Sequence, residues 1–347
     1  MSSTPVSLQL RDHRDWKVVA SESFHKLQEF LEFCEIDPAV CGATVHQGFK
    51  LRVTRYYASL IEKGNASDPL LLQVLPTASE FLQVPGYQRD AVGDQLSVRV
   101  PGLIHKYHGR VLLTLTGACA VNCRYCFRRH FPYNENITGL HMSGPVMSYL
   151  SENTDISEVI LSGGDPLMAS DQKLARLVNC LNQLPHIRTL RVHSRVLSVL
   201  PERVTAELID VLKQFSGKVV IVTHINHPNE ISQHNRHTFQ TLTRHGFALF
   251  NQSVLLKGVN DCWKTLVDLS QKLFESGITP YYLHRLDKVE GAAHFDLPAD
   301  ESCRIYRRMR ERLPGYLLPM MVDEIEGQIS KIPVEDLRID KLQDNRT

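Results

Sequence analysis

The stretch from Arg110 to Cys126, RVLLTLTGACAVNCRYC, joins a short apolar run to three closely spaced cysteines. Residues 111–115 are apolar or β-branched and predict a β-strand. Cys119, Cys123 and Cys126 follow in the loop that leaves this strand. Thiolates so close together can bind one metal centre. The segment therefore predicts one strand of a sheet and a functional site at that strand's end.

Five similar runs follow, separated by stretches long enough to hold helices. They lie at residues 159–161, 190–193, 219–223, 248–252 and 279–283. The clearest intervening helix is predicted by an apolar stripe at helical spacing, formed by Leu174, Leu177, Val178, Leu181 and Leu184. Strands alternating with helices indicate a parallel sheet, and six units are too few for a full TIM barrel. We expect an α/β fold with a partial (β/α)6 barrel over residues 106–315.

The flanking regions are less regular. Residues 1–105 predict a helical and irregular N-terminal region, in which the composition of residues 85–102 is loop-like. Residues 316–347 form a short C-terminal segment.

The overall composition is that of a globular enzyme. Of the 347 residues, 43% are hydrophobic and 22% are charged, and the formal net charge is +1. This balance gives no reason to expect nucleic acid or an anionic membrane as a partner. Residues 1–16 lack the apolar core of a secretory signal, and no apolar run is long enough to span a membrane. We expect a cytoplasmic protein, and leave open whether it forms a homo-oligomer.

Polar residues follow each predicted strand. The six segments are TGAC (116–119), SGGDP (162–166), HSR (193–195), HINH (224–227), NQS (251–253) and HRLD (284–287). In parallel α/β folds ligands bind at the carboxyl ends of the strands. These segments therefore predict one active site.

Three cysteines leave two kinds of metal centre open. A structural zinc site needs four protein ligands, and His130 is the nearest candidate for the fourth. An iron–sulfur cluster with three cysteine ligands would instead keep one iron free for another molecule.

The C-x3-C-x2-C spacing resembles that of the radical S-adenosylmethionine superfamily. The resemblance implies that Cys119, Cys123 and Cys126 hold a [4Fe–4S] cluster whose open iron binds S-adenosylmethionine. It also implies that Tyr125 lies near the adenine, and that the backbone of Gly163, Gly164 and Asp165 meets the methionine moiety.

Longer segments resemble the lysine 2,3-aminomutase family within that superfamily. They are residues 105–110 (HKYHGR), 126–129 (CFRR), 224–230 (HINHPNE) and 251–261 (NQSVLLKGVND). The resemblance implies pyridoxal phosphate as a further cofactor, bound covalently by Lys331, with Lys106 and Arg110 near its phosphate. It further implies that Arg128 pairs with the substrate carboxylate.

The family resemblance implies conversion of L-α-lysine to (R)-β-lysine, in which acidic residues hold the distant ε-ammonium group. One of these positions corresponds to Asp323. At the other, Arg285 stands where an aspartate is expected, and Asp287 lies two residues further on. An aminomutase for arginine or glutamate therefore stays open, as does a non-catalytic iron–sulfur protein.

Residues 283–295 (LHRLDKVEGAAHF) resemble short family members that supply β-lysine for elongation factor P. The resemblance implies a functional link to that factor and to the ligase that attaches β-lysine to it.

Overall fold

The computed structural model describes residues 14–45, 48–138 and 144–334, and its centre is one ten-stranded sheet in the order β1 to β10. Strands β3 to β9 are parallel to one another. An antiparallel hairpin of β1 and β2 extends one edge, and β10 pairs antiparallel with β9 at the other. The strands are β1 (Val98–Val100), β2 (Leu103–Tyr107), β3 (Arg110–Thr114), β4 (Glu158–Ser162), β5 (Thr189–Ser194), β6 (Lys218–Thr223), β7 (Ala248–Val254), β8 (Thr279–His284), β9 (Met320–Asp323) and β10 (Ile332–Pro333).

All six predicted strands are confirmed, as β3 to β8. The α/β class and the partial barrel are confirmed with them, and β9 adds a seventh parallel strand that was not predicted. The loop-like interpretation of residues 85–102 was wrong at its end, where β1 forms. The segment Val-Arg-Val is too short to give a strand pattern of its own, and pairing with β2 stabilises it.

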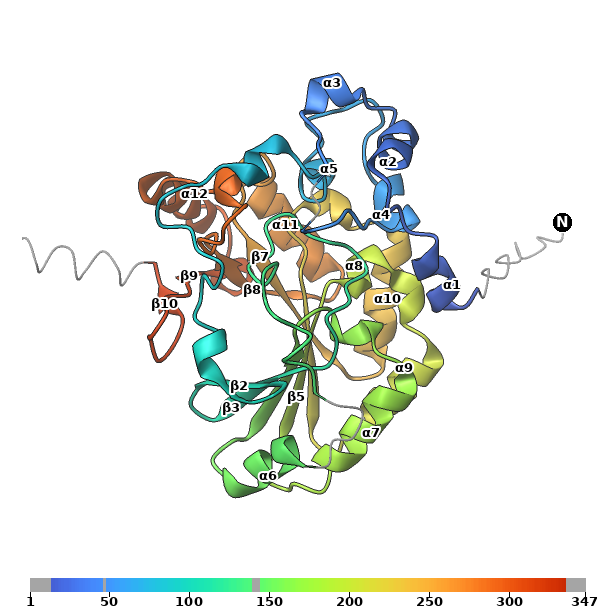
Figure 1. The fold of residues 1–347 in the computed structure, drawn as a ribbon, viewed down its shortest axis with the longest axis vertical. Coiled ribbons are helices and arrows are strands. Elements are labelled where there is room, and N and C mark those ends of the chain that lie inside the picture. Colours follow the sequence, from blue (N-terminus) through green and yellow to red (C-terminus); the bar gives the residue numbers. More distant parts are fainter. Residues whose placement is uncertain (1–13, 46–47, 139–143, 335–347) are drawn as a thin grey trace, which may run out of the picture.

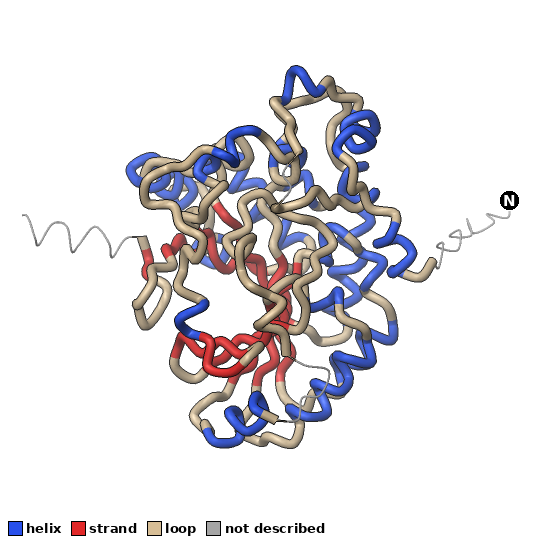
Figure 2. The backbone as a smooth tube through the Cα atoms, viewed as in Figure 1, coloured by secondary structure: helices blue, strands red, loops and turns tan. Residues whose placement is uncertain are grey.

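Helices cover the outer face of the sheet and one end of the barrel. Figure 1 shows α7, α9 and α10 outside the strands, and α2 to α5 together at the top of the molecule. Figure 2 shows the same separation of a strand core from surrounding helices. The α-helices are α1 (Trp16–Ser21), α2 (Leu27–Cys34), α3 (Pro38–Cys41), α4 (Arg55–Ser59), α5 (Pro69–Leu72), α6 (Pro145–Glu152), α7 (Asp171–Leu181), α8 (Val196–Val199), α9 (Ala206–Lys213), α10 (Gln233–Arg244), α11 (Trp263–Glu275) and α12 (Ala299–Arg310). The 3-10 helices are η1 (Ala78–Phe81), η2 (Gln95–Ser97), η3 (Pro166–Met168), η4 (Pro201–Arg203), η5 (Pro228–Glu230), η6 (Ala293–Phe295) and η7 (Gly315–Leu317).

Helix α7 shows how local sequence sets the packing. The Ser170 hydroxyl caps its first turn by accepting from the Lys173 backbone N–H. Leu174, Leu177 and Leu181 of the predicted stripe are buried, in the same hydrophobic core as Val159 and Leu161 of β4. The helix therefore covers the outer face of the sheet.

Strand residues alternate between this outer core and the barrel interior. In β4, Val159 and Leu161 belong to the hydrophobic core, whereas Glu158, Ile160 and Ser162 line an internal cavity. In β5, Leu190 and Val192 point outward while Arg191 and His193 point inward. Polar side chains are thus collected inside the barrel by the alternation itself.

The N-terminal region packs directly on the loop that carries the cysteines. Asn122 donates from its backbone N–H to the Arg52 carbonyl at 3.0 Å, and Arg124 to the Gln73 carbonyl at 2.9 Å. Hydrophobic residues from α1, α2 and α4 join the same core as the barrel strands. None of the helices in the described part of the chain has the length and apolar composition needed to cross a lipid bilayer.

Candidate active site

A cavity of about 620 Å³ lies inside the partial barrel. Its size suits small-molecule ligands. Of the site residues predicted from the sequence, all but Asp323 line it. They are Cys119, Cys123, Cys126, Tyr125, Arg128, Lys106, Arg110, Gly163, Gly164, Asp165 and Lys331. Residues 225 positions apart along the chain are therefore brought to one site by the barrel.

The three cysteines are free thiols that line this cavity. Arg195 donates from Nη1 to the sulfur of Cys123 at 2.7 Å. Thiols that face one space, one of them met by an N–H group, fit the ligand set of an iron–sulfur cluster.

The zinc alternative is not favoured by the geometry. No three His, Cys, Asp or Glu side chains in the described ranges converge on one ion position. In a four-iron cluster each cysteine binds a different iron, so the three cysteine sulfurs need not converge on a single ion position. His130 does not line the cavity, and its Nε2 donates instead to the Glu290 carbonyl at 3.1 Å.

The Gly-Gly-Asp segment holds the cysteine loop from the next strand. A Cβ atom on Gly164 would lie 2.6 Å from the Ala118 carbonyl oxygen, so only glycine fits there. The Asp165 carboxylate accepts from the Ser194 hydroxyl at 2.7 Å and from the Arg195 N–H at 2.8 Å. Asp165 is thus engaged in joining the β4 and β5 loops, and Gly163 and Gly164 expose backbone to the cavity.

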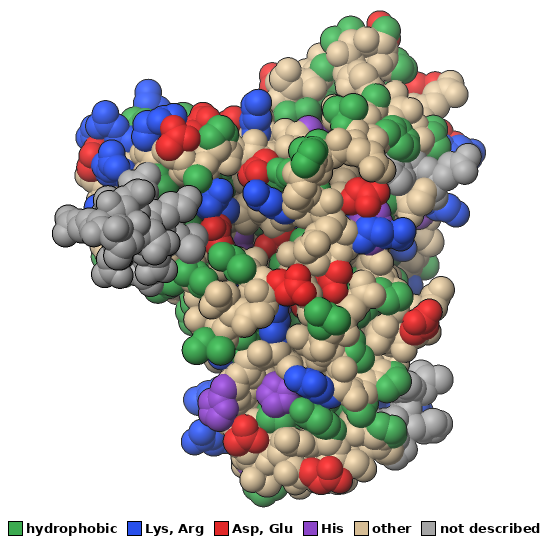
Figure 3. Space-filling view, turned by 60° about the vertical axis from the view of Figure 1, so that its left-hand side comes forward, with side chains coloured by type: hydrophobic (Ala, Val, Ile, Leu, Met, Phe, Trp, Pro, Cys, Tyr) green, Lys and Arg blue, Asp and Glu red, His purple; other side chains and the backbone are tan. Residues whose placement is uncertain are grey.

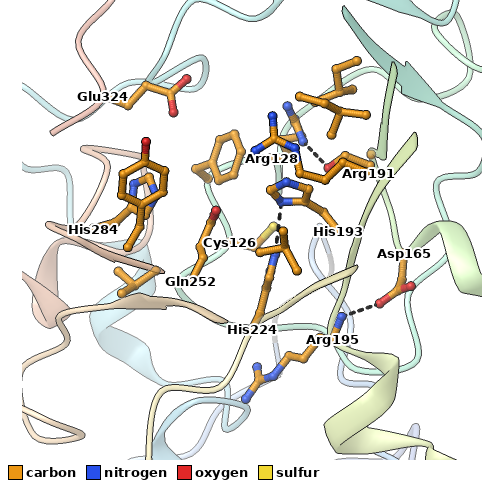
Figure 4. Close-up of a pocket in the computed structure, with 18 of the residues that line it drawn as sticks. Cys126, Arg128, Asp165, Arg191, His193, Arg195, His224, Gln252, His284 and Glu324 are labelled. Carbon is orange, nitrogen blue, oxygen red and sulfur yellow. Dashed lines mark hydrogen bonds between the residues drawn. The ribbon is translucent and has the colours of Figure 1, made fainter. Parts of the chain in front are cut away.

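Arg128 is fixed in orientation by two partners. Its Nε donates to Asp94 at 2.7 Å and its Nη1 donates to the Ser162 hydroxyl at 2.9 Å. Figure 4 shows this guanidinium group beside His193 and Cys126. A cation held in this way is preorganised for an anionic group of a ligand.

Lys331 and Lys106 both bind the carboxylate of Glu324. The Nζ of Lys331 donates to Glu324, which also accepts from Lys106 Nζ at 2.8 Å. Although burial alone would raise it, these ammonium groups hold the pKa of Glu324 well below its usual range. Lys106 was expected near a cofactor phosphate, but here its ammonium group is bound to Glu324. Arg110 lies over the Tyr107 ring, 4.7 Å from its centroid.

An amine with a nearby guanidinium group in one cavity fits pyridoxal phosphate. Lys331 supplies the amine, and Arg110 supplies the positive charge that a phosphate requires.

Asp287 and Glu324 are carboxylates near Lys331 to which the sequence analysis assigned no role of their own, although Asp287 lies in the predicted strand-end segment 284–287. Asp287 follows β8 and lines the cavity. Burial, reinforced by the charge of Glu324, raises the pKa of Asp287 to about 7. The sequence signal for Asp287 was its position three residues after β8, because the active site was predicted at the ends of the strands.

Arg285 and Asp323 form an ion pair with each other, at 2.9 Å between Nη1 and Oδ2. Neither lines the cavity. Asp323 was expected to contact the substrate, and the structure does not bring it to the other site residues. Arg285 likewise presents no positive charge to the cavity, because it extends to β9 instead.

Histidines from three strand ends also line the cavity, at positions 193, 224 and 284. His224 Nε2 lies 3.4 Å from His193 Nδ1, a contact drawn in Figure 4. Burial, with the nearby charge of Arg195, lowers the pKa of His224 to about 4. These side chains are therefore neutral near pH 7 and leave the charge of the cavity to its arginine, lysine and carboxylate groups.

Comparison with known proteins agrees with this site. A family model described as a 4Fe-4S single cluster domain matches residues 108–214. Among solved structures, a radical SAM methyltransferase from Sphaerobacter thermophilus gives a TM-score of 0.45 at 18% identity, over 64% of this chain and 68% of that chain. That similarity is low, and the family assignment depends on the sequence relatives instead.

The chain is 44% identical to L-lysine 2,3-aminomutase of Escherichia coli, over 95% of this chain and 97% of that protein. It is 42% identical to the protein of that name from Haemophilus influenzae, over 95% and 98%. The Clostridium subterminale protein is 33% identical, over 93% of this chain and 78% of its own length. Similarity of this extent covers nearly the whole chain, and the chain belongs to the lysine 2,3-aminomutase family of radical S-adenosylmethionine enzymes.

Proposed function

We propose that this enzyme converts L-α-lysine to (R)-β-lysine with a [4Fe–4S] cluster, S-adenosylmethionine and pyridoxal phosphate. The observation that carries the proposal is one cavity lined by the three cysteines, Arg128 and Lys331. The names of the relatives support lysine as the substrate.

The cofactors and the protein divide the chemistry. When bound, the cluster and S-adenosylmethionine supply hydrogen-atom abstraction, and pyridoxal phosphate supplies delocalisation of the radical while nitrogen migrates. Cys119, Cys123 and Cys126 would hold the cluster, Lys331 the pyridoxal phosphate, and Arg110 its phosphate.

Arg128 would bind the substrate carboxylate. Its hydrogen bonds to Asp94 and Ser162 fix the guanidinium plane before substrate arrives. A preorganised fork loses little rotamer freedom when it binds a carboxylate. Holding this end of lysine limits the motion of the carbons between which the amino group moves.

Asp287 and Glu324 would hold the ε-ammonium group. Glu324 already accepts from two ammonium groups, so this part of the cavity is suited to cations. Asp287 has its pKa raised to about 7, and an arriving ammonium would favour its ionised form. Carboxylates and the guanidinium group of Arg128 in one cavity suit lysine, which carries both a cationic side chain and an anionic carboxylate.

The role in elongation factor P modification is supported by residues 283–295, which have the form of short family members with that role. We therefore propose that a ligase consumes the β-lysine and that the enzyme acts in the cytoplasm, where that factor works.

The test is an anaerobic assay of protein reconstituted with iron, sulfide and pyridoxal phosphate. Reductant, S-adenosylmethionine and either L-lysine, L-arginine or L-glutamate are added, and products are identified by mass spectrometry after derivatisation. We expect β-lysine from lysine alone, and its loss in Cys126→Ala and Lys331→Ala. Release of 5′-deoxyadenosine without β-lysine would reject free lysine as the substrate, and a β-amino acid from arginine or glutamate would replace it.

A matched pair of variants tests the ammonium site. Asp287→Asn removes a carboxylate that lines the cavity, whereas Asp323→Asn removes one that pairs with Arg285 outside it. Loss of a charged hydrogen-bond partner costs about 1.5–3 kcal/mol, so KM for lysine should rise roughly 10- to 100-fold in Asp287→Asn. Asp323→Asn should keep a KM close to that of the wild type. A raised KM in Asp323→Asn with an unchanged KM in Asp287→Asn would show that Asp323, and not Asp287, binds the ammonium group.

A further inference from the structure

Arg195 is a buried arginine at the point where several segments meet the cysteine loop. It follows β5, is 7% exposed, and has no part in the substrate contacts proposed above. Figure 4 shows its side chain extending away from Asp165, toward the region behind His224.

The two terminal nitrogens of the guanidinium group bind different partners. Nη2 donates to Gln73 Oε1 at 2.8 Å, to Glu230 Oε2 at 3.1 Å and to the Tyr57 hydroxyl at 3.2 Å. Nη1 donates to the sulfur of Cys123 at 2.7 Å. The first set of bonds anchors the guanidinium group to α4, to the residue after α5 and to η5, and the last directs an N–H group at a cluster ligand.

The donor to Cys123 is a cationic side chain. Its contribution can therefore be removed by substitution.

Hydrogen bonds to cluster sulfurs favour the reduced form, because reduction adds negative charge that the N–H dipole stabilises. The reaction concerned is transfer of one electron from a low-potential one-electron donor to the cluster, in which no bond is made or broken. Glu230 offsets the net charge of Arg195 through Nη2. The directional N–H bond from Nη1 remains, and burial strengthens it.

We propose that Arg195 is a positioning residue that raises the reduction potential of the cluster by donating from Nη1 to the thiolate of Cys123. This inference depends on the cluster of the proposed function, and not on the aminomutase reaction or on pyridoxal phosphate.

The experiment compares Arg195→Met and Arg195→Lys with a control, Arg203→Lys. Arg203 is also buried, but it donates to the carbonyls of Leu167 and Ala169 and to Asp171, and not to a cysteine sulfur. Iron and sulfide are measured per chain in the reconstituted full-length proteins. The fraction of reduced cluster is then followed by electron paramagnetic resonance during a potentiometric titration with dithionite.

We expect Arg195→Met to require a more negative potential for half-reduction. At the wild-type midpoint its ratio of reduced to oxidised cluster should be at least tenfold smaller, which corresponds to about 59 mV for one electron. Arg195→Lys retains a cationic donor and should fall between Arg195→Met and the wild type, whereas Arg203→Lys should match the wild type.

A wild-type midpoint in Arg195→Met with a full complement of iron would overturn the proposal, and so would an equal shift in Arg203→Lys. If Arg195→Met binds no iron, an unshifted midpoint in Arg195→Lys overturns the proposal and a negative shift supports it. A wild-type cluster with a measurable midpoint but no β-lysine would reject the proposed reaction and leave this inference standing.

Discussion

The protonation state of each carboxylate in the cavity depends on the groups around it rather than on its residue type. Glu324 is ionised because Lys331 and Lys106 contact it, whereas burial favours the neutral form of Asp287. Two carboxylates at one end of the cavity thus differ in protonation near pH 7. Divergent pKa values of this kind are a feature of functional sites.

The raised pKa of Asp287 predicts a pH-dependent stability of the cofactor-free protein. From about pH 5 to 7 this group is protonated in the folded chain and ionised in the unfolded chain. The free energy of unfolding therefore falls as pH rises through this range, by up to about 3 kcal/mol for two pH units at 1.36 kcal/mol per unit. Thermal unfolding at several pH values should show a weaker dependence in Asp287→Asn. A slope unchanged from that of the wild type would contradict the assignment, and Asp300→Asn on the exposed face of α12 is the control.

Arg128 predicts a specific loss of substrate affinity. Arg128→Lys keeps the positive charge but loses the planar fork and one of the bonds to Asp94 and Ser162. We expect KM for lysine to rise roughly 10- to 100-fold, the equivalent of about 1.5–3 kcal/mol. The iron content of the reconstituted protein should stay at the wild-type level, and an unchanged KM would exclude the carboxylate contact.

At the scale of elements, the cysteine loop is held by a buried ionic group outside the barrel. Glu80 in η1 accepts from Arg124 and Arg129, which flank Cys126, and all three side chains are fully buried. Both guanidinium groups also lie over the Phe49 ring, at 4.6 and 4.7 Å. The N-terminal region therefore positions the loop that binds the cluster.

Removing the charge of Glu80 should destabilise the protein strongly. Glu80→Gln leaves two buried guanidinium groups without their carboxylate, which costs about 3–5 kcal/mol in comparable cases. We expect a lower melting temperature and a lower iron content after reconstitution. Glu29→Gln changes an exposed pair with Lys26 and should alter neither. Equal melting temperatures for both variants would show that Glu80 is not required.

Prediction of the strands from sequence succeeded because each pattern is local, and the six strands carry their own apolar runs. The structure brings the cysteines and Lys331 to one cavity, and their roles stay predictions. Strand β9 was missed because Met320–Asp323 is short and shows no alternation. Glu324 and the contact of Arg195 with Cys123 were missed because they depend on partners 218 and 72 residues away along the chain.

Over the whole molecule, one barrel interior receives residues from Asp94, which precedes β1, to Lys331, which follows β9. The domain boundaries at residues 105 and 315 stay predictions, and the sheet crosses both, since β2 spans Leu103–Tyr107 and β9 pairs with β8. Figure 3 shows basic and acidic side chains interspersed on the face drawn there, including around the basic cluster at its upper left.

Migration of the amino group within lysine is tested most directly by an isotope label on that nitrogen. L-lysine labelled with ¹⁵N on the α-amino group is turned over by the reconstituted enzyme, and the product is analysed by mass spectrometry and NMR. We predict β-lysine with the label on carbon 3, because the same nitrogen moves within one molecule bound by Arg128 and by the carboxylates near Lys331. A product without the label, or no β-lysine from protein that carries its full cluster, would contradict it.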